Sequence, residues 1–499
     1  MRNPLTAPLP PRHSRAGSPA PVCLLTALVL ALALPGCGLP RKADKVFLTS
    51  TRPRVDVFVR SHGAPARKLF LQLDSVRLRE ARGAELELEL HRDQLDSVES
   101  RRRVSFAGGA VQAASYDAII IALRGAAIER DGRRSQLSLN TATAELEGES
   151  LEPELLVLEV PIRLRVRPTD AASVFLDWDI DASLDDQGNL QPVFSLSTEG
   201  RQVLLGRMYV TDGASSSLLA VERSSGEVLA SVGVGAEPRD LAVSRDLRRI
   251  FVANARDGSL SVVDLRQNLV TSTLQIRIGA GTWDVAVLDR GDELLATNRS
   301  IDSVVFFDTN QSTKLAEVAV GRRPTRIAVS SRLNRAFVAN SLSNDVSVLD
   351  LNSRSLVGTV GVESGPVDLV LDRRERELFV AHKISQDLLV IDTTTLAAVD
   401  SIFIGGDATA LLADRRRDRI YVARSNPAEL AVVDRRLSAV VRRIPLSGPI
   451  SSLAQPIDGS VIYGASPELG GVLPIDILSA KQGELIPCGQ RPTSVVFVD

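Results

Sequence analysis

The sequence predicts an all-β protein built in two parts, and two observations carry this prediction. The first is a motif that recurs seven times between residues 207 and 499. Each copy has a strand such as R-x-F-V-A-N, a polar turn, a strand ending in Val-Asp, and a strand ending near Val-Gly, after which G-x-x-P opens the next copy. The second is the period-two alternation of apolar residues ahead of the repeats, which is typical of half-buried β-strands.

The strands that end in Val-Asp give the length of the repeat. Successive strands end 42, 44, 42, 42, 42 and 42 residues apart. Their last residues are Glu222, Asp264, Asp308, Asp350, Asp392, Asp434 and Asp476. A period of about 40 to 45 residues with four short strands per copy is typical of a β-propeller blade. The seven copies therefore predict a seven-bladed propeller over residues 207–499, a fold that hosts many unrelated activities.

The order of the strands predicts how the ring closes. Residues 207–212 correspond to the second strand of a blade, counted from the centre of the ring. The chain ends on residues 491–499, which match first strands such as residues 323–329. We therefore expect the C-terminal strand to complete the blade that begins at residue 207, because this pairs edges that would otherwise stay open.

The repeat sequences resemble a known family. They read RRIFVANARDGSLSVVDL from Arg248, NRAFVANSLSNDVSVLDL from Asn334 and RELFVAHKISQDLLVIDT from Arg376. This resembles the YVTN family of β-propeller repeats, and residues 208–212, Met-Tyr-Val-Thr-Asp, are the copy closest to the Tyr-Val-Thr-Asn core. The resemblance covers about 290 residues and implies a propeller. In the last three copies the core Asn is replaced by His382, Arg424 and Ser466.

The N-terminus has the features of a targeting segment. Basic residues precede an apolar run at residues 22–34, which is too short to span a bilayer as a helix. The run leads into Leu-Pro-Gly-Cys at residues 34–37, which resembles the lipobox of bacterial lipoproteins. The resemblance implies a signal peptide at residues 1–36, and acyl chains on Cys37 that anchor the protein firmly in a membrane.

We expect residues 37–52 to form a tether that leads from this anchor. The expected location is then the bacterial cell envelope, at the outer membrane if the cell has two. The alternative is ordinary secretion with a free Cys37. Cys23 lies in the predicted signal peptide, so Cys488 would be the remaining thiol, and we expect it to be a blade-turn residue rather than a nucleophile.

Residues 53–200 are predicted to form an antiparallel β-sandwich, because apolar residues alternate over short runs such as 55–59 and 174–180. Segments at 115–121 and 175–179 resemble a lipoprotein-associated domain of unknown function, which brings no known active site. Three carboxylates share one predicted strand face, and three arginines share another: Asp177, Asp179 and Asp181, and Arg163, Arg165 and Arg167. We predict a hairpin that pairs these charges, in preference to a Ca²⁺ site.

Composition and motifs restrict the chemistry. The formal net charge is -2, which gives no general attraction to nucleic acid. The four histidines are scattered, and the sequence contains no haem, zinc-protease, nucleophile-elbow or phosphate-loop motif. We therefore expect no metal, no cofactor and no catalytic residue of these types.

A binding site in a propeller is expected where loops converge. The turns after the second strands and the loops before the first strands should share one face. The turn positions are Asp212, Asn254, Asn298, Asn340, His382, Arg424 and Ser466. The loop positions are Arg239, Asp240, Trp283, Asp284, Arg326, Asp368 and Thr409.

Eight of these positions make up the predicted binding face: Arg239, Asp240, Trp283, Asp284, Arg326, Asp368, His382 and Arg424. A ring of polar groups with one aromatic side chain suits a peptide or a sugar. The opposing interpretation is that the Asn and Asp side chains cap tight turns. The Val-Asp carboxylates are expected to be turn-formers in the same way.

These observations favour a binding function: a rigid platform that recognises a protein, peptide or glycan at the envelope. A hydrolase is the alternative, because some propeller lactonases share repeats of this kind and would need converging acid–base or metal-binding groups. The third interpretation is a purely structural assembly module.

Overall fold

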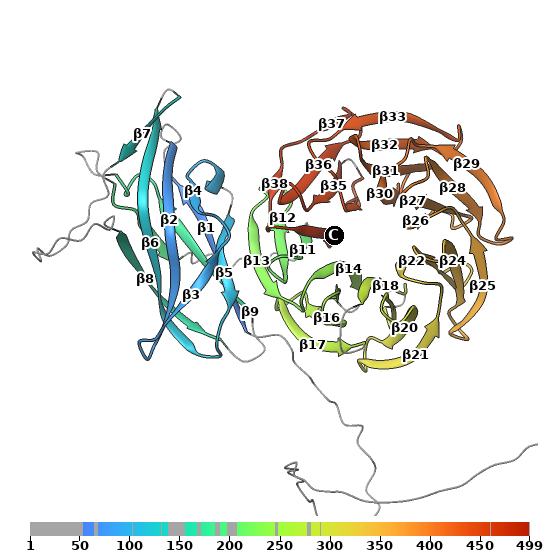
Figure 1. Ribbon diagram of the computed structural model, residues 1–499, viewed down its shortest axis with the longest axis horizontal. Coiled ribbons are helices and arrows are strands. Elements are labelled where there is room, and N and C mark those ends of the chain that lie inside the picture. Colours follow the sequence, from blue (N-terminus) through green and yellow to red (C-terminus); the bar gives the residue numbers. More distant parts are fainter. Residues whose placement is uncertain are drawn as a thin grey trace, which may run out of the picture. The chain divides into compact units, whose positions relative to one another are not determined.

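The computed structural model describes residues 53–498, apart from 64–67, 102, 131, 138–154, 167–170, 185–189, 197–206, 245–247, 277–280, 290 and 460. The predicted signal peptide, Cys37 and the predicted tether lie outside the described residues. In the described part of the chain, no helix is long and apolar enough to cross a membrane. Figure 1 shows a domain of blue to teal strands and a ring of blades coloured from green to red.

The N-terminal domain is one ten-stranded sheet in the form of a half-barrel. Its path runs β10-β9-β1-β5-β3-β2-β6-β7, with β4 on β2 and β8 on β6. The strands are β1 (Arg54–His62), β2 (Lys68–Glu80), β3 (Glu85–Leu90), β4 (Gln94–Asp96), β5 (Val104–Ala110), β6 (Ser115–Arg130), β7 (Arg133–Leu137), β8 (Leu156–Arg165), β9 (Ala171–Asp179) and β10 (Val193–Leu196), with a 3-10 turn at Glu99–Arg101.

Period-two alternation decides which side of this sheet is buried. Val57 of β1, Ile121 of β6 and Trp178 of β9 are fully buried and belong to one core. Strands from both halves of the sheet thus enclose a single core. The predicted β-sandwich domain is present as an all-β domain, in the form of a half-barrel made by one continuous sheet.

The predicted hairpin between residues 163–167 and 177–181 is wrong. Strand β8 pairs with β6, and β9 instead pairs with β1 in parallel, so that Arg60 lies opposite Asp177. Their side chains form an ion pair of 3.2 Å. Arg163 and Arg165 are exposed, and Arg167 lies outside the described residues. Alternation determines the buried face but not the partner strand, and β1 offers β9 a matching apolar face, including a contact of Phe58 with Phe175.

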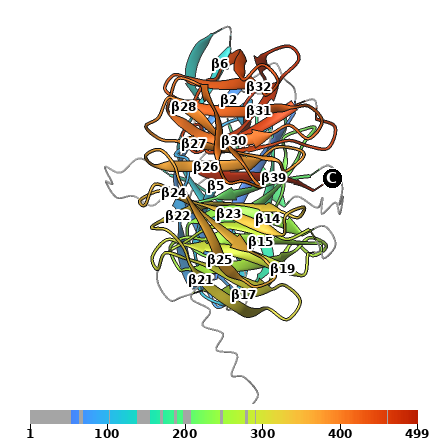
Figure 2. The same ribbon diagram turned by 90° about the vertical axis from the view of Figure 1, so that its right-hand side faces the viewer.

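Seven blades form the ring. Their strands are named blade by blade, from the centre of the ring outward. They are β39 (Pro492–Val498), β11 (Arg207–Asp212), β12 (Ser217–Glu222), β13 (Val228–Gly233); β14 (Pro238–Ser244), β15 (Arg249–Asn254), β16 (Ser259–Asp264), β17 (Leu269–Gln275); β18 (Thr282–Val287), β19 (Glu293–Asn298), β20 (Ser303–Asp308), β21 (Thr313–Ala319); β22 (Pro324–Ser330), β23 (Arg335–Asn340), β24 (Asp345–Asp350), β25 (Ser355–Gly361); β26 (Pro366–Leu371), β27 (Glu377–His382), β28 (Asp387–Asp392), β29 (Ala398–Phe403); β30 (Ala408–Ala413), β31 (Arg419–Ser425), β32 (Ala428–Asp434), β33 (Ala439–Pro445); and β34 (Ser452–Ala454), β35 (Val461–Ser466), β36 (Gly471–Asp476), β37 (Lys481–Gln482), β38 (Ile486–Pro487). We number the blades 1 to 7 in this order. Figure 2 looks onto the edge of the ring at β21 and β25.

The ring closes as the sequence predicts. Strand β39 pairs with β11 in antiparallel register, with Val495 opposite Val210. The Oδ1 and Oδ2 atoms of Asp212 accept hydrogen bonds from the backbone N–H groups of Arg491 and Gln490, at 2.8 and 2.9 Å. The C-terminal strand is therefore the first strand of blade 1 and joins the two ends of the ring.

The repeated Val-Asp carboxylates are turn-formers, as expected. Asp308 Oδ1 accepts hydrogen bonds from the N–H groups of Asn310 and Gln311, at 2.8 and 2.7 Å. Asp476 Oδ1 accepts equivalent bonds from residues 478 and 479. These backbone hydrogen bonds hold the pKa of Asp476 below its usual value. The repeated carboxylates at this position therefore shape the blades, and their oxygens already accept hydrogen bonds from the turns.

Candidate functional site

A cavity of about 820 Å³ opens at one end of the ring's axis. Turns after second strands contribute Arg299, Lys383 and Ser425, while loops before first strands contribute Arg323 and Asp407. The two groups of loops therefore line one cavity, as the sequence analysis expected. Four of the predicted face residues are among the lining residues: Arg239, Asp240, Trp283 and Arg326.

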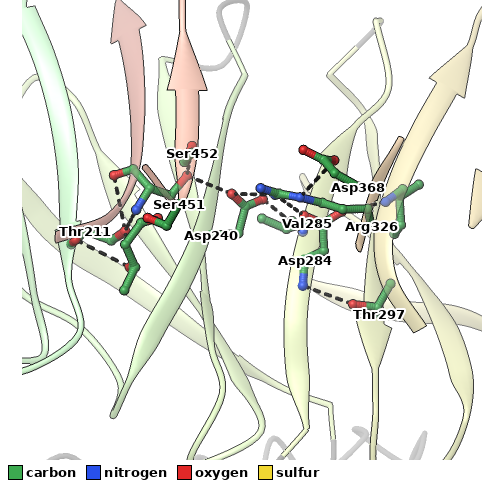
Figure 3. Close-up of polar contacts among 12 residues, drawn as sticks. Thr211, Asp240, Asp284, Val285, Thr297, Arg326, Asp368, Ser451 and Ser452 are labelled. Carbon is green, nitrogen blue, oxygen red and sulfur yellow. Dashed lines mark hydrogen bonds and ion pairs between the residues drawn. The ribbon is translucent and has the colours of Figure 1, made fainter. Parts of the chain in front are cut away.

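One side chain from the first strand of each blade lies at an equivalent position near the axis. These positions are Asp240, Asp284, Arg326, Asp368, Ala410, Ser452 and Ser494. Arg326 is the only cation among them and reaches three carboxylates (Figure 3). Its Nη1 lies 2.7 Å from Asp284 Oδ1 and 3.2 Å from Asp240 Oδ1, and its Nε lies 3.3 Å from Asp368 Oδ1. We call these four residues the axial network.

Each carboxylate of the axial network also binds the next blade. Asp284 Oδ2 accepts a 2.7 Å hydrogen bond from the N–H of Ile327 in blade 4, and Asp368 Oδ2 accepts one of 2.7 Å from the N–H of Leu411 in blade 6. Asp240 Oδ2 makes a longer bond of 3.5 Å with the N–H of Val285 in blade 3. The axial network thus ties neighbouring blades together, and its acceptor oxygens are occupied.

The axial network holds three carboxylates against one guanidinium, and all three carboxylates are buried. Burial raises the pKa of Asp284 well above its usual value, and the nearby charge of Asp240 raises it further. Burial by itself lowers the pKa of Arg326, but the charges of Asp368, Asp284 and Asp240 outweigh this, so its net pKa shift is upward. The raised pKa favours the protonated form of the Asp284 carboxyl group.

A second group of charges surrounds Trp283 at the mouth of the cavity. The guanidinium carbon of Arg299 lies 3.8 Å from the centre of the indole ring, and that of Arg239 lies 4.7 Å from it. Burial, and after it the charges of Arg323 and Arg239, lower the pKa of Arg299 to about 10. We call Arg239, Arg299, Arg323 and Lys383 the basic rim.

Four predicted face residues do not line the cavity: Asp284 and Asp368, which lie in the axial network, and His382 and Arg424. His382 is fully buried at the end of β27, and burial lowers its pKa. Arg424 is also buried, where it forms an ion pair with Glu429 and donates a 2.7 Å hydrogen bond to the carbonyl oxygen of Gly406. Both therefore shape their own blade. That the predicted face binds a ligand stays a prediction.

The Asn residues that end second strands, at the position that His382 takes in blade 5, have a structural role. Asn340 Nδ2 donates hydrogen bonds of 2.6 Å to Asp345 Oδ1 and 2.9 Å to Ser347 Oγ. A Cβ atom on Gly321 would lie 2.6 Å from that nitrogen, so the preceding loop needs glycine there. Asn340 thus braces side chains of its own blade, whereas Asn298 fits the turn-capping interpretation, because its Oδ1 accepts a 3.0 Å hydrogen bond from the backbone N–H of Ser300.

Sequence reasoning missed Arg299, Arg323 and Lys383. Each lies one residue after a core Asn or His, or one residue before the Pro that opens a first strand. Their position in the loops that meet at one end of the ring was the sequence signal that could have identified them. The chain contains so many arginines that none of them stood out by composition.

Among the described residues, metal-binding side chains and the Cys488 thiol do not come together at this cavity. Across the described ranges, no group of three or more His, Cys, Asp or Glu residues could hold a metal ion. Cys488 is buried in an apolar cluster, and burial raises its pKa, which disfavours the reactive thiolate.

Comparisons with known proteins support the fold. No family model matches the chain, and no curated protein matches it either. Among solved structures, a functionally unknown protein from Desulfotomaculum acetoxidans DSM 771 is 11% identical with a TM-score of 0.52, over 58% of this chain and 98% of that one. A chain of Kuenenia stuttgartiensis hydrazine synthase is 19% identical with a TM-score of 0.48, over 52% and 89%. The likeness to the Desulfotomaculum acetoxidans protein, at 11% identity, concerns the fold alone.

Proposed function

We propose that this chain is a lipoprotein of the bacterial cell envelope whose propeller binds a protein, peptide or glycan. One observation carries the proposal: a cavity of about 820 Å³ at the end of the ring's axis, lined by an aromatic side chain and by cations from several blades. Concave sites with a few convergent polar groups are where proteins usually bind ligands.

The geometry favours binding over hydrolysis. A propeller hydrolase needs a carboxylate or a metal that is free to act on its substrate. Here Asp284 and Asp368 bind Arg326 and hold backbone N–H groups of the next blades. These buried carboxylates are therefore part of the framework of the ring.

The YVTN-like repeats and the lipobox-like segment at residues 34–37 support the envelope location. Acyl chains on Cys37 would attach the chain to the membrane. The anchor is tested by the intact mass of the protein extracted from native membranes, compared with Cys37→Ala. A mature chain that begins at Cys37 with added acyl mass supports the anchor, and an unmodified chain contradicts it.

The binding role is tested by photo-crosslinking in native membranes. A photoreactive residue at Ser425, which lines the cavity on blade 6, is compared with one at Arg374, an exposed residue in the turn after β26. We expect crosslinked products from position 425 and few from position 374. Equal yields at the two positions would contradict a binding role for the cavity.

A further inference from the structure

Charge is unevenly distributed around the cavity. The basic rim comes from blades 2 and 3, the loop before blade 4, and blade 5: Arg239, Arg299, Arg323 and Lys383. The acidic lining residues outside the axial network are Asp407, just before blade 6, and Glu468, from blade 7. Among the lining residues, this side of the opening therefore carries more positive than negative charge.

The cations of this rim have spare hydrogen-bonding capacity. Among the described residues, the Nε atoms of Arg239 and Arg299 are buried and have no hydrogen-bond partner. The guanidinium of Arg239 lies 3.7 Å from Glu237, but that carboxylate is also held by Arg491 at 3.0 Å. Burial is the first cause of the lowered pKa values of both arginines; the charges of Arg323 and Arg239 add to it at Arg299, whereas Glu237 opposes it at Arg239. Such groups are suited to an anionic ligand.

Two aliphatic side chains are exposed in the turns after second strands, on the blades that follow Arg299 in the ring. Leu342, which lines the cavity, is 53% exposed, and Ile384, directly after Lys383, is 73% exposed. They follow the second strands of the neighbouring blades 4 and 5. Exposed Leu and Ile have no partner in a sugar polymer, whereas Trp, Arg and apolar groups together are typical of the sites where proteins bind other proteins.

We propose that the basic rim, together with Leu342 and Ile384, binds an acidic segment of a partner protein. Carboxylates of the segment pair with Arg299, Arg323 and Lys383, and an apolar side chain of the segment packs against Leu342 and Ile384. Trp283 keeps Arg239 and Arg299 in place through its ring contacts. This inference rests on the proposed binding function and names the chemistry of its ligand.

The test is a selection from a random peptide display library on the full chain, with counter-selection on the variant Arg299→Gln/Arg323→Gln. We expect the selected peptides to be rich in Asp or Glu next to Leu, Ile or Phe. Labelled copies of these peptides are then measured by fluorescence anisotropy. They should bind about tenfold more weakly to Arg299→Gln and to Arg323→Gln than to the wild-type chain. Their binding should also weaken as ionic strength rises.

Two controls make the result specific. Arg374→Gln removes an exposed arginine in a turn between a first and a second strand, away from the cavity, and should leave binding unchanged. Replacing the acidic residues of a selected peptide by Asn and Gln should abolish its binding.

Three outcomes would overturn the inference. One is enrichment of neutral or basic peptides, and another is equal binding of acidic peptides to the double variant. The third is that an oligosaccharide of uronic acids binds in place of the selected peptides, which would point to an acidic glycan. In each case a cavity-specific crosslink at position 425 would still support the broader binding function, so the two proposals fail separately.

Discussion

The axial network reaches the cavity through Asp240 and Arg326, and the basic rim lines its mouth. The two groups use arginine side chains in opposite ways. In the axial network, Arg326 has three carboxylates within 3.3 Å, and these carboxylates also hold backbone N–H groups of the next blades. At the rim, Arg299 lies against Trp283 and experiences mainly the charges of other arginines. A cation that is fully paired inside the ring contributes to the architecture. A cation left without counter-charge at the mouth can bind an incoming anion.

The largest effect is expected when the ring that supports both groups is opened. Deletion of residues 491–499 removes β39, and with it Ser494, which donates a 2.8 Å hydrogen bond to Asp240. It also leaves the edge of β11 unpaired. We expect the propeller to lose cooperative unfolding as a whole. A thermal unfolding trace that keeps its transition would contradict closure by β39.

The next effect concerns the cation of the axial network. Arg326→Met leaves three buried carboxylates without their counter-charge, which should lower the free energy of unfolding by about 3–5 kcal/mol. Denaturant unfolding of the full chain measures this change. The matched control at the rim is Arg323→Met, for which we expect a change within about 0.5 kcal/mol because the side chain is exposed. Equal losses in the two variants would remove the distinction between axial network and rim.

A smaller effect should appear in the dependence of stability on pH. The folded-state pKa of Asp284 is raised above 3.8, its usual value, so the folded state binds the proton more tightly than the unfolded state. The proton on Asp284 therefore stabilises the folded state fully at pH values below the unfolded-state pKa. This stabilisation is lost as the pH rises through the raised folded-state pKa. Asp284→Asn should therefore flatten the pH profile of the melting temperature in that range. A wild-type profile that matches the variant would show that Asp284 ionises normally.

The smallest effect on stability is expected at Arg299. Arg299→Gln removes a cation that is partly desolvated and close to Arg239 and Arg323. We expect the melting temperature to stay the same or rise slightly, because like-charge repulsion is relieved. Differential scanning calorimetry checks this. A clear loss of stability would show that Arg299 has a structural role like that of Arg326.

Much of the fold could be predicted from the sequence, because residues at a regular spacing form the same turn in successive blades. The 42-residue spacing of Asp308, Asp350 and Asp392 reflects one turn made again in each of these blades. The N-terminal sheet was harder. Alternation showed that Trp178 is buried, but the pairing of β9 with β1 joins segments more than a hundred residues apart, and no local pattern encodes it.

The site could be predicted in part. The sequence placed Asp240, Asp284 and Arg326 at equivalent blade positions, but the reach of Arg326 to three carboxylates depends on the size of the ring. Placing Arg299 beside Trp283 depends on how the turn after β19 folds toward the neighbouring first strand. The chain is rich in arginine, so an individual arginine in a loop carried little information.

The most direct test of the distinction between axial network and rim is one titration. A labelled acidic peptide from the selection is titrated into the wild-type chain and into Arg323→Gln, with the melting temperatures of both proteins confirmed in the same buffer. We predict that the variant binds the peptide about tenfold more weakly while its melting temperature is unchanged. Unchanged affinity, or an affinity lost together with the fold, would contradict the assignment of the rim to ligand binding.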